Sequence, residues 1–274
     1  MSNRVAFAIA CHPDDIEFMM SGTLILLKEA GYETHYLNVA NGSCGSMKES
    51  AARLKPMRKK EGQEAARILG AHFHPSLADD LDIFYEPKLL RRLAAVIRDV
   101  RPSILLTHSL HDYMEDHTNT ARLTVTAAFA RGMPNYATNP RRAPIDGDVT
   151  VYHALPHGLR DAMRLRIFPE SFVDVSSVHE TRLAALAAHR SQQNWLDASQ
   201  KMSSYLQTME DVARSVGEMS GSARSRFVLA EGWRRHHYAG FCAKEADPLH
   251  DALQKKYRIN PGYQRWLDAG LGNS

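Results

Sequence analysis

Short apolar runs and amphipathic stretches alternate along the first two-thirds of the chain. Some of the apolar runs, such as Ile104-Leu105-Leu106, have no polar position at all. Runs of this kind are typical of parallel strands that are buried on both faces. The apolar runs predict β-strands at 5–10, 34–40, 103–107, 149–155 and 172–175.

The stretches between these strands carry apolar residues at helical spacing. Two of them stop at Gly31 and Gly70, and glycine readily adopts the left-handed conformation common at helix ends. The expected helices span 18–30, 56–69, 87–100 and 118–131. Strands that alternate with helices are typical of a parallel sheet covered by helices on both faces. The sequence therefore predicts an α/β fold of three layers, similar to a Rossmann fold.

The last third of the chain has a different pattern. Beyond residue 178 it is mainly helical, with candidate helices at 180–194 and 201–216 and no further convincing strand. We therefore expect an α/β core over residues 1–195 and a helical C-terminal extension, packed on the core, over 196–274. Two segments rich in glycine, proline or polar residues, 41–55 and 133–148, predict loops that border a site.

Composition excludes several classes of protein. The 274 residues are 44% hydrophobic and 24% charged, as in ordinary globular proteins, which excludes collagen-like and largely disordered chains. The 34 Lys and Arg residues are scattered and nearly balanced by 31 Asp and Glu residues, so no nucleic-acid partner is expected. No apolar run approaches the roughly 18 residues of a membrane-spanning helix. A homo-oligomer is compatible with the sequence.

The cysteines favour a reducing compartment. Cys11, Cys44 and Cys242 are widely spaced and form no pair typical of a zinc knuckle or a redox motif. We therefore expect a cytoplasmic protein. Residues 1–11 are similar to a short export signal, because Arg4 precedes an apolar run. We interpret that run as the first strand, because the most chemically reactive segment follows it directly.

That segment is Cys11-His12-Pro13-Asp14-Asp15-Ile16-Glu17. It lies at the carboxyl end of the first strand, where open parallel sheets bind their ligands. His12 and Asp15 are three residues apart around a turn, so an imidazole nitrogen and a carboxylate oxygen can bind one metal ion. Asp14 is then free to accept a proton from the metal-bound water. The alternative is a turn whose carboxylates only cap the next helix.

A third metal ligand is expected from the polar segment that follows the predicted strand at 103–107. This segment runs from His108 to His117 and leads into a helix, so it can face the first turn across the sheet. His117 is the best candidate in it. Three protein ligands with an open fourth position are typical of a catalytic zinc site rather than a structural one.

These motifs together resemble the zinc-dependent N-deacetylases of the PIG-L or LmbE-like family. The matching segments are His-Pro-Asp-Asp with Glu17, Asp116-His117, Arg58-Lys59-Lys60-Glu61 and His189-Arg190-Ser191-Gln192. The resemblance covers most of the first 195 residues. It implies a metal-dependent amidohydrolase that acts on a small N-acyl, sugar-like substrate. It also implies that one zinc ion (Zn²⁺) per chain is bound by His12, Asp15 and His117, with Asp14 as the general base and Arg58 facing the substrate.

One position departs from the family pattern. Many members have a histidine three residues before the last ligand, which is thought to stabilise the oxyanion or to protonate the leaving amine; this chain has Met114. Methionine can do neither. The catalytic candidates to replace it are His111 and Tyr113, with His153 as a further possibility. Asp112 would orient one of them or contact the substrate, as Asn41 would at the end of the second strand.

Three alternative functions remain at this point. The first is an amidase of a thiol-conjugated glucosamine derivative, which would use the same metal centre. The second is a non-catalytic binder of metal or sugar. The third is a nucleotide-binding module, which is disfavoured because no glycine-rich loop follows the first strand. Cys11 is expected to fill space beside the site rather than to act as a nucleophile.

Overall fold

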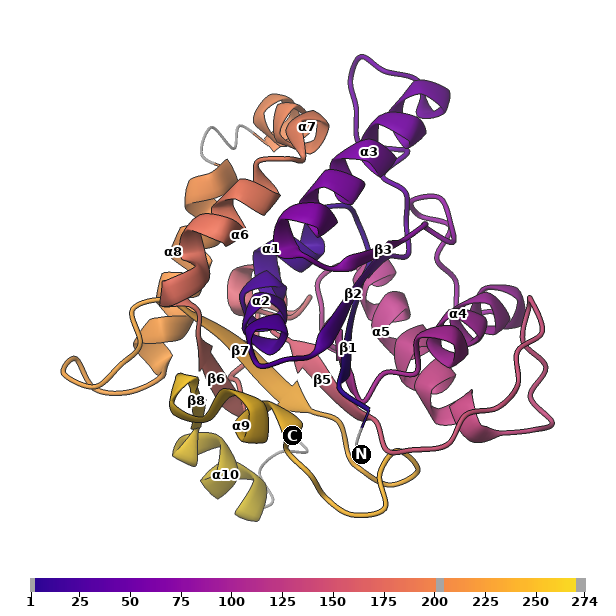
Figure 1. Cartoon of the computed structure of the whole chain (residues 1–274). Helices are drawn as coiled ribbons and strands as arrows, with labels where there is room; N and C mark the ends of the chain where they lie inside the picture. The colour runs from indigo at the N-terminus through magenta and orange to yellow at the C-terminus, as the bar shows by residue number, and fades with distance from the viewer. Residues whose placement is uncertain (1–2, 201–204, 270–274) are drawn as a thin grey trace.

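The computed structural model describes residues 3–200 and 205–269, without the side chains of 197–200. Helices and strands alternate through most of this length (Figure 1). In chain order the elements are β1 (Val5–Ala10), α1 (Asp15–Met19), α2 (Ser21–Glu29), β2 (Glu33–Asn38), α3 (Ala51–Leu69), β3 (His72–His74), α4 (Pro87–Val100), β4 (Ile104–Thr107), α5 (Glu115–Phe129), β5 (Thr150–Ala154), β6 (Ser171–Asp174), α6 (His179–Leu186), α7 (Arg190–Gln200), α8 (Tyr205–Met219), β7 (Ala230–Arg235), α9 (Pro248–Leu253), β8 (Tyr257–Ile259) and α10 (Pro261–Asp268).

The eight strands of the described residues form one sheet in the order β3-β2-β1-β4-β5-β7-β6-β8. The pairs from β3 to β5 are parallel, whereas β7 is antiparallel to both of its neighbours and β8 is antiparallel to β6. The strand order reverses between β1 and β4, because the chain first adds β2 and β3 on one side of β1 and then crosses to the other side. Ligands of such sheets bind at this reversal, beyond the carboxyl ends of the strands.

The sheet separates two hydrophobic cores. Ala6, Ala8 and Ala10 of β1 face a core shared with α1, α2, α6 and α8. Phe7 and Ile9 face the opposite core, which is shared with α4 and α5. Figure 1 shows these two helical layers on either side of the strands. The predicted three-layer α/β fold with a mostly parallel core is confirmed.

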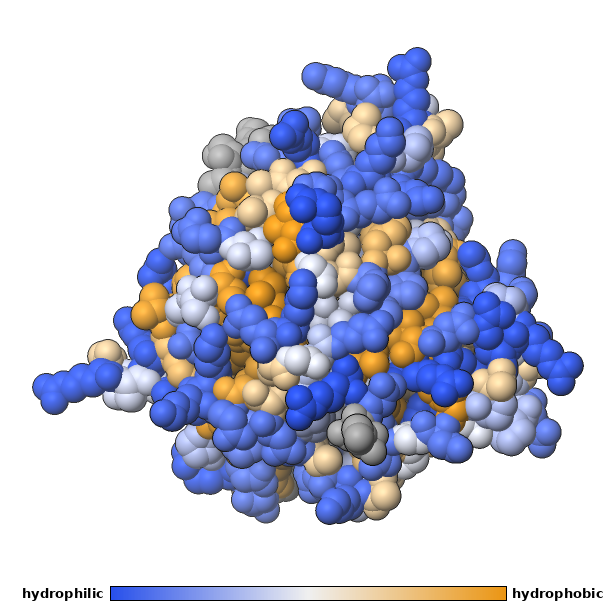
Figure 2. All heavy atoms as spheres, in the orientation of Figure 1, coloured by the Kyte–Doolittle hydropathy of each residue, from blue (hydrophilic) through white to orange (hydrophobic). Residues whose placement is uncertain are grey.

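The visible surface of the protein is mostly hydrophilic. In the orientation of Figure 2, hydrophilic residues cover most of the projecting surface, and the apolar surface lies mainly in the gaps between elements. Among the helices of the described residues, none combines the length and the apolar character needed to cross a membrane.

The predicted strands are present with small shifts at their ends, and the helices differ more. The helix expected at 18–30 is divided into α1 and α2, and the one expected at 180–194 is divided into α6 and α7. The expected loop at 41–55 ends at residue 50, and Pro56 lies inside α3 rather than in its first turn. The start of the helix expected at 201–216 lies outside the described residues.

The segment over 196–274 differs from the expected helical extension, because it also supplies β7 and β8. β7 lies between β5 and β6 rather than at an edge. Its Glu231 accepts hydrogen bonds from the backbone amides of Gly22 and Thr23 at the start of α2, both at 2.8 Å, and faces Arg182 at 3.3 Å. A buried glutamate followed by a glycine breaks the apolar pattern of a central strand, which is why the sequence did not predict β7.

Candidate active site

Two loops meet where the strand order reverses. Residues 11–14 follow β1, and residues 108–114 follow β4, which pairs directly with β1. In the first loop the amide of Asp15 donates a hydrogen bond to the carbonyl of His12, and Asp14 has a left-handed backbone with φ of 113°. Such a conformation is uncommon for a residue other than glycine, although aspartate tolerates it better than most. The turn thus directs Asp14 and Asp15 in different directions.

Three side-chain atoms converge at this point: His12 Nδ1, Asp15 Oδ2 and His117 Nε2. The two imidazole nitrogens are 3.3 Å apart, and they lie 3.5 and 3.4 Å from the carboxylate oxygen. Ligands held at about 2.0–2.1 Å on a tetrahedral ion are separated by about 3.3 Å. The spacing of these three atoms therefore fits one metal ion of that size.

The outer ring nitrogens of both histidines face carboxylates. His12 Nε2 donates to Asp116 Oδ2 at 3.2 Å, and His117 Nδ1 donates to Asp112 Oδ1 at 3.1 Å. Hydrogen bonds to carboxylates favour the tautomers with the ring protons on the outer nitrogens, which offer the lone pairs of the two converging nitrogens to a metal ion. Two lone pairs and a carboxylate oxygen in mutual contact repel one another unless a cation lies between them. The donor set therefore fits a divalent metal.

A substitution at Asp112 tests this arrangement. Asp112→Ala is expected to weaken metal binding by roughly 10–100-fold, because the carboxylate that fixes the His117 ring is lost. The measurement is a competition titration against a chelator. Asp251→Ala removes an exposed aspartate from α9 and should leave the metal affinity unchanged. An Asp112→Ala variant with wild-type affinity would remove this residue from the support of the centre.

Asp14 lies beside the three converging atoms but faces a different partner. It is buried, and its Oδ2 accepts a hydrogen bond of 2.6 Å from the hydroxyl of Tyr205 on α8. Burial, together with the charge of Asp15, raises the pKa of Asp14 to about 7. For Asp15, burial opposes ionisation, but His117 and His108 outweigh it and hold the pKa of Asp15 well below its usual range. Two adjacent carboxylates whose pKa values are shifted in opposite directions are typical of a site in which one stays ionised, as a metal ligand must, and the other exchanges a proton.

A cavity of about 360 Å³ opens above these groups. One part of its wall is polar and includes the metal-site residues, Asp14 and Arg58. The rest is largely apolar and comes from α1, α7 and the loops before α4 and α5. These apolar residues are Phe18, Met19, Leu81, Tyr113, Met114, Trp195 and Leu196.

The other residues singled out from the sequence lie at different distances from this cavity. Arg58 lines it, is almost fully buried, and donates from Nη2 to the Gly45 carbonyl at 2.7 Å. Tyr113 lines it with half of its surface exposed, whereas His111 is exposed outside the lining.

His153 is buried and donates from Nδ1 to the carbonyl of His108. Asp112 lies behind His117 rather than in the lining.

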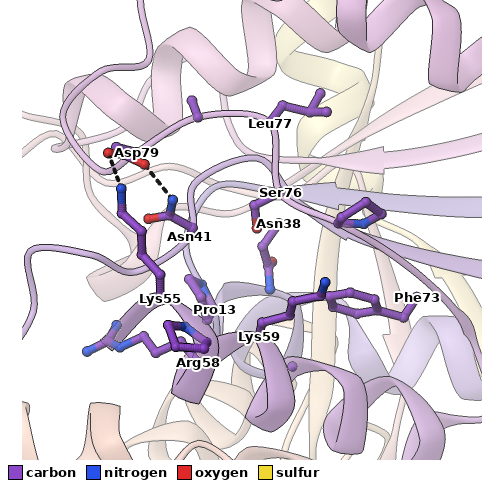
Figure 3. Close-up of a pocket in the computed structure, with 14 residues that line it drawn as sticks. Pro13, Asn38, Asn41, Lys55, Arg58, Lys59, Phe73, Ser76, Leu77 and Asp79 are labelled. Carbon is purple, nitrogen blue, oxygen red and sulfur yellow. Dashed lines mark hydrogen bonds and ion pairs between the residues drawn. The ribbon is translucent and has the colours of Figure 1, made fainter. Parts of the chain in front are cut away.

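Asn41 belongs to a neighbouring cavity of about 350 Å³ (Figure 3). Its amide donates to Asp79, which also pairs with Lys55. The two cavities share Arg58, whose guanidinium in Figure 3 points away from the centre of this second cavity. The structure therefore separates Asn41 from the metal-site residues.

Three residues that lie at the site in the structure were not expected there from the sequence. His108 stacks on His117 with ring centres 4.2 Å apart and accepts a hydrogen bond from the Cys11 amide. His157, just after β5, lines the cavity. Tyr205 comes from α8, far along the chain. His108 could have been expected at the site, because it follows β4 directly. Tyr205 belongs to no motif.

Comparison with known proteins relates one part of the chain to a known family. Residues 7–128 match the PIG-L family, described as GlcNAc-PI de-N-acetylase. The chain carries a PIG-L family domain. The matched region contains His12, Asp14, Asp15, Arg58 and His117, and it ends within α5.

Relatives extend the similarity beyond this domain. The chain is 29% identical to a diacetylchitobiose deacetylase of Thermococcus kodakarensis over 80% of this chain and 79% of that one. It is 28% identical to a 4-oxalmesaconate hydratase of Pseudomonas putida over 84% and 88% of the two chains. The solved structure of the 4-carboxy-2-hydroxymuconate hydratase GalB from Pseudomonas putida matches with a TM-score of 0.72 at 25% identity, over 90% and 99% of the two chains.

Proposed function

We propose that the protein is a zinc-dependent hydrolase that removes an N-acetyl group from a small, sugar-like substrate. The observation that carries the proposal is the convergence of His12, Asp15 and His117 with Asp14 alongside, within a PIG-L family domain. The similarity to a deacetylase that acts on a sugar supports the same reaction. The metal ion, when bound, supplies Lewis-acid activation of the amide carbonyl and of the attacking water.

Asp14 is the proton carrier in this mechanism. Tyr205 occupies one of its carboxylate oxygens, which leaves the other for the attacking water. Asp14 accepts a proton as the water attacks and returns it to the amine nitrogen as the carbon–nitrogen bond breaks. One carboxylate can thus serve both steps, because the proton released in the first is consumed in the second.

The carbonyl oxygen needs a hydrogen-bond donor as its negative charge develops. Met114 lines the cavity without offering one. Tyr113 and His157 line the same cavity, and burial raises the pKa of Tyr113, so its hydroxyl keeps its proton at neutral pH. We assign the donor role to these two residues rather than to His111, which lies outside the lining. Arg58 is left to hold a hydroxyl or an anionic group of the substrate.

Tyr205→Phe tests the orientation of Asp14. The variant is expected to lower kcat by roughly tenfold, the effect of losing one hydrogen bond to a charged group, with KM and metal content unchanged. The measurement is steady-state kinetics beside metal analysis and thermal unfolding. Tyr238→Phe changes a partly exposed tyrosine outside the cavity lining and should have no effect. An equal rise in KM with unchanged kcat would show that Tyr205 acts on binding instead.

Hydration of a carbon–carbon double bond is a second candidate function, favoured by the similarity to a 4-oxalmesaconate hydratase. Hydrolysis of an N-acetyl group releases acetate and an amine, whereas addition of water to a double bond gives a single product. The zinc-loaded protein should be incubated with N-acetylglucosamine, N,N′-diacetylchitobiose, a thiol-conjugated N-acetylglucosamine derivative and 4-carboxy-2-hydroxymuconate, an unsaturated tricarboxylate. Acetate and free amine released in a 1:1 ratio would support the proposal, and the active compound would give the substrate type. Loss of the absorbance of the unsaturated tricarboxylate with no acetate from any amide would overturn it.

A further inference from the structure

Leu81 combines two unfavourable features at the mouth of the catalytic cavity. The residue is 67% exposed, and its backbone is left-handed with φ of 64°. Leucine rarely adopts this conformation, because its Cβ approaches the neighbouring carbonyl oxygen. Glycine or asparagine would suit the backbone better and would expose less apolar surface. Strain of this kind is concentrated at functional sites.

Neighbouring groups hold the loop around Leu81 in place. The amide of Leu81 donates to Asp116 Oδ2 at 2.8 Å, the same oxygen that accepts from His12. The carboxylate of Asp80 accepts from the amides of Gly42 and Cys44 at 2.6 and 2.9 Å. These bonds involve backbone groups and aspartates, so the loop conformation does not depend on the leucine side chain.

Leu81 belongs to a larger apolar surface that we name the apolar rim. Tyr113 in the loop before α5 is 48% exposed, and Met114 beside it is half-buried. Trp195 and Leu196 of α7 border the same cavity and are half-buried. The apolar rim consists of Leu81, Tyr113, Met114, Trp195 and Leu196. Three separate segments therefore bring apolar side chains to one opening that also contains the charged groups of the site.

We propose that the substrate carries an apolar aryl or alkyl group on its amine-bearing half and that the apolar rim binds this group. The proposal rests on the proposed function, because an acetyl group has only two carbons and the amine-bearing half must then extend to the mouth of the cavity. The aromatic rings of the rim can also stack on a sugar, but the rim's aliphatic and thioether side chains, Leu81, Met114 and Leu196, gain most from burial against an apolar substituent. Continuity of the rim with the catalytic cavity favours the substrate as its occupant.

The test compares two probes that differ only in this group, the methyl and 4-nitrophenyl β-glycosides of N-acetylglucosamine. Affinities are measured by calorimetry on the zinc-loaded Asp14→Asn protein, so that binding is read without turnover. The aryl glycoside is expected to bind at least about tenfold more tightly than the methyl glycoside, the effect of burying one apolar side chain. Leu81→Asn in the same background should reduce this preference several-fold and leave the affinity for the methyl glycoside unchanged.

A second readout and a matched control separate strain from binding. Leu81→Asn is expected to raise Tm by roughly 2–4 °C, because asparagine tolerates a left-handed backbone. Leu165→Asn replaces a leucine that is 64% exposed outside the lining of the cavity and should change neither the preference nor Tm. A higher Tm with a lost preference would support a leucine retained for binding at the expense of stability.

Other outcomes would overturn the inference. Equal affinities of the two glycosides for the parent protein would exclude an apolar subsite, as would failure of both to bind. If Leu81→Asn left both affinities unchanged but altered the oligomeric state in sedimentation experiments, the rim would be a contact between copies of the chain. Failure of the proposed function is seen separately, as tight binding of the aryl glycoside by the wild-type protein without release of acetate.

Discussion

Replacing His117 with alanine is expected to remove the metal ion and to lower kcat/KM by about four orders of magnitude. His117 Nε2 is one of three converging ligand atoms, and its ring is fixed by Asp112 and by stacking on His108. His12 and Asp15 alone cannot complete a site of three protein ligands. Metal content is measured by mass spectrometry on the purified variant, beside the kinetics.

His111→Ala is the matched control for this experiment. His111 lies in the same loop but is exposed and outside the cavity lining, so its removal should leave the metal content unchanged. Thermal unfolding of both variants shows whether the fold is retained, because His117 belongs to neither of the two hydrophobic cores. Full metal content in His117→Ala would contradict the ligand assignment.

Asp14→Asn is expected to retain the metal and to lower kcat by roughly 10²–10⁴-fold, the usual contribution of a positioned general base. Asparagine tolerates the left-handed backbone of this position and keeps an oxygen that can accept the Tyr205 hydroxyl, so the local structure should be preserved. What the variant loses is the ability to take a proton from water. The measurement is kcat at saturating substrate, together with metal content.

Asp82→Asn changes the charge by the same amount at an exposed position outside the cavity lining and should leave kcat unchanged. Loss of the metal in Asp14→Asn would make Asp14 a ligand rather than a base. Unchanged kcat with full metal content would remove Asp14 from the mechanism.

Much of the fold could be predicted because the central strands are short and apolar throughout. β1 coincides with the predicted strand at 5–10, and β4 differs from its prediction by one residue. β7 could not be predicted from the same pattern, because Glu231 and Gly232 interrupt it. That glutamate is compensated by Arg182 and by two helix amides, which are partners that only the folded chain brings together.

The residues of the metal site could be predicted from their spacing along the sequence. His12 and Asp15 lie on one turn after β1, and His117 lies in the first turn of the helix that follows the neighbouring strand, so the sheet topology alone brings them together. Tyr205, Trp195 and Leu196 could not be found in this way. They reach the site through packing of the last third of the chain, and no motif marks them.

Restoring zinc to metal-free protein tests the central claim most directly. Wild-type protein is stripped with a chelator, dialysed and titrated with Zn²⁺ while acetate release from the best N-acetyl substrate is followed. We expect no acetate release without metal, a linear rise of the rate with added zinc, and a plateau at one equivalent of zinc per chain. Full acetate release by the metal-free protein, or a plateau at a different stoichiometry, would contradict a single catalytic metal at His12, Asp15 and His117.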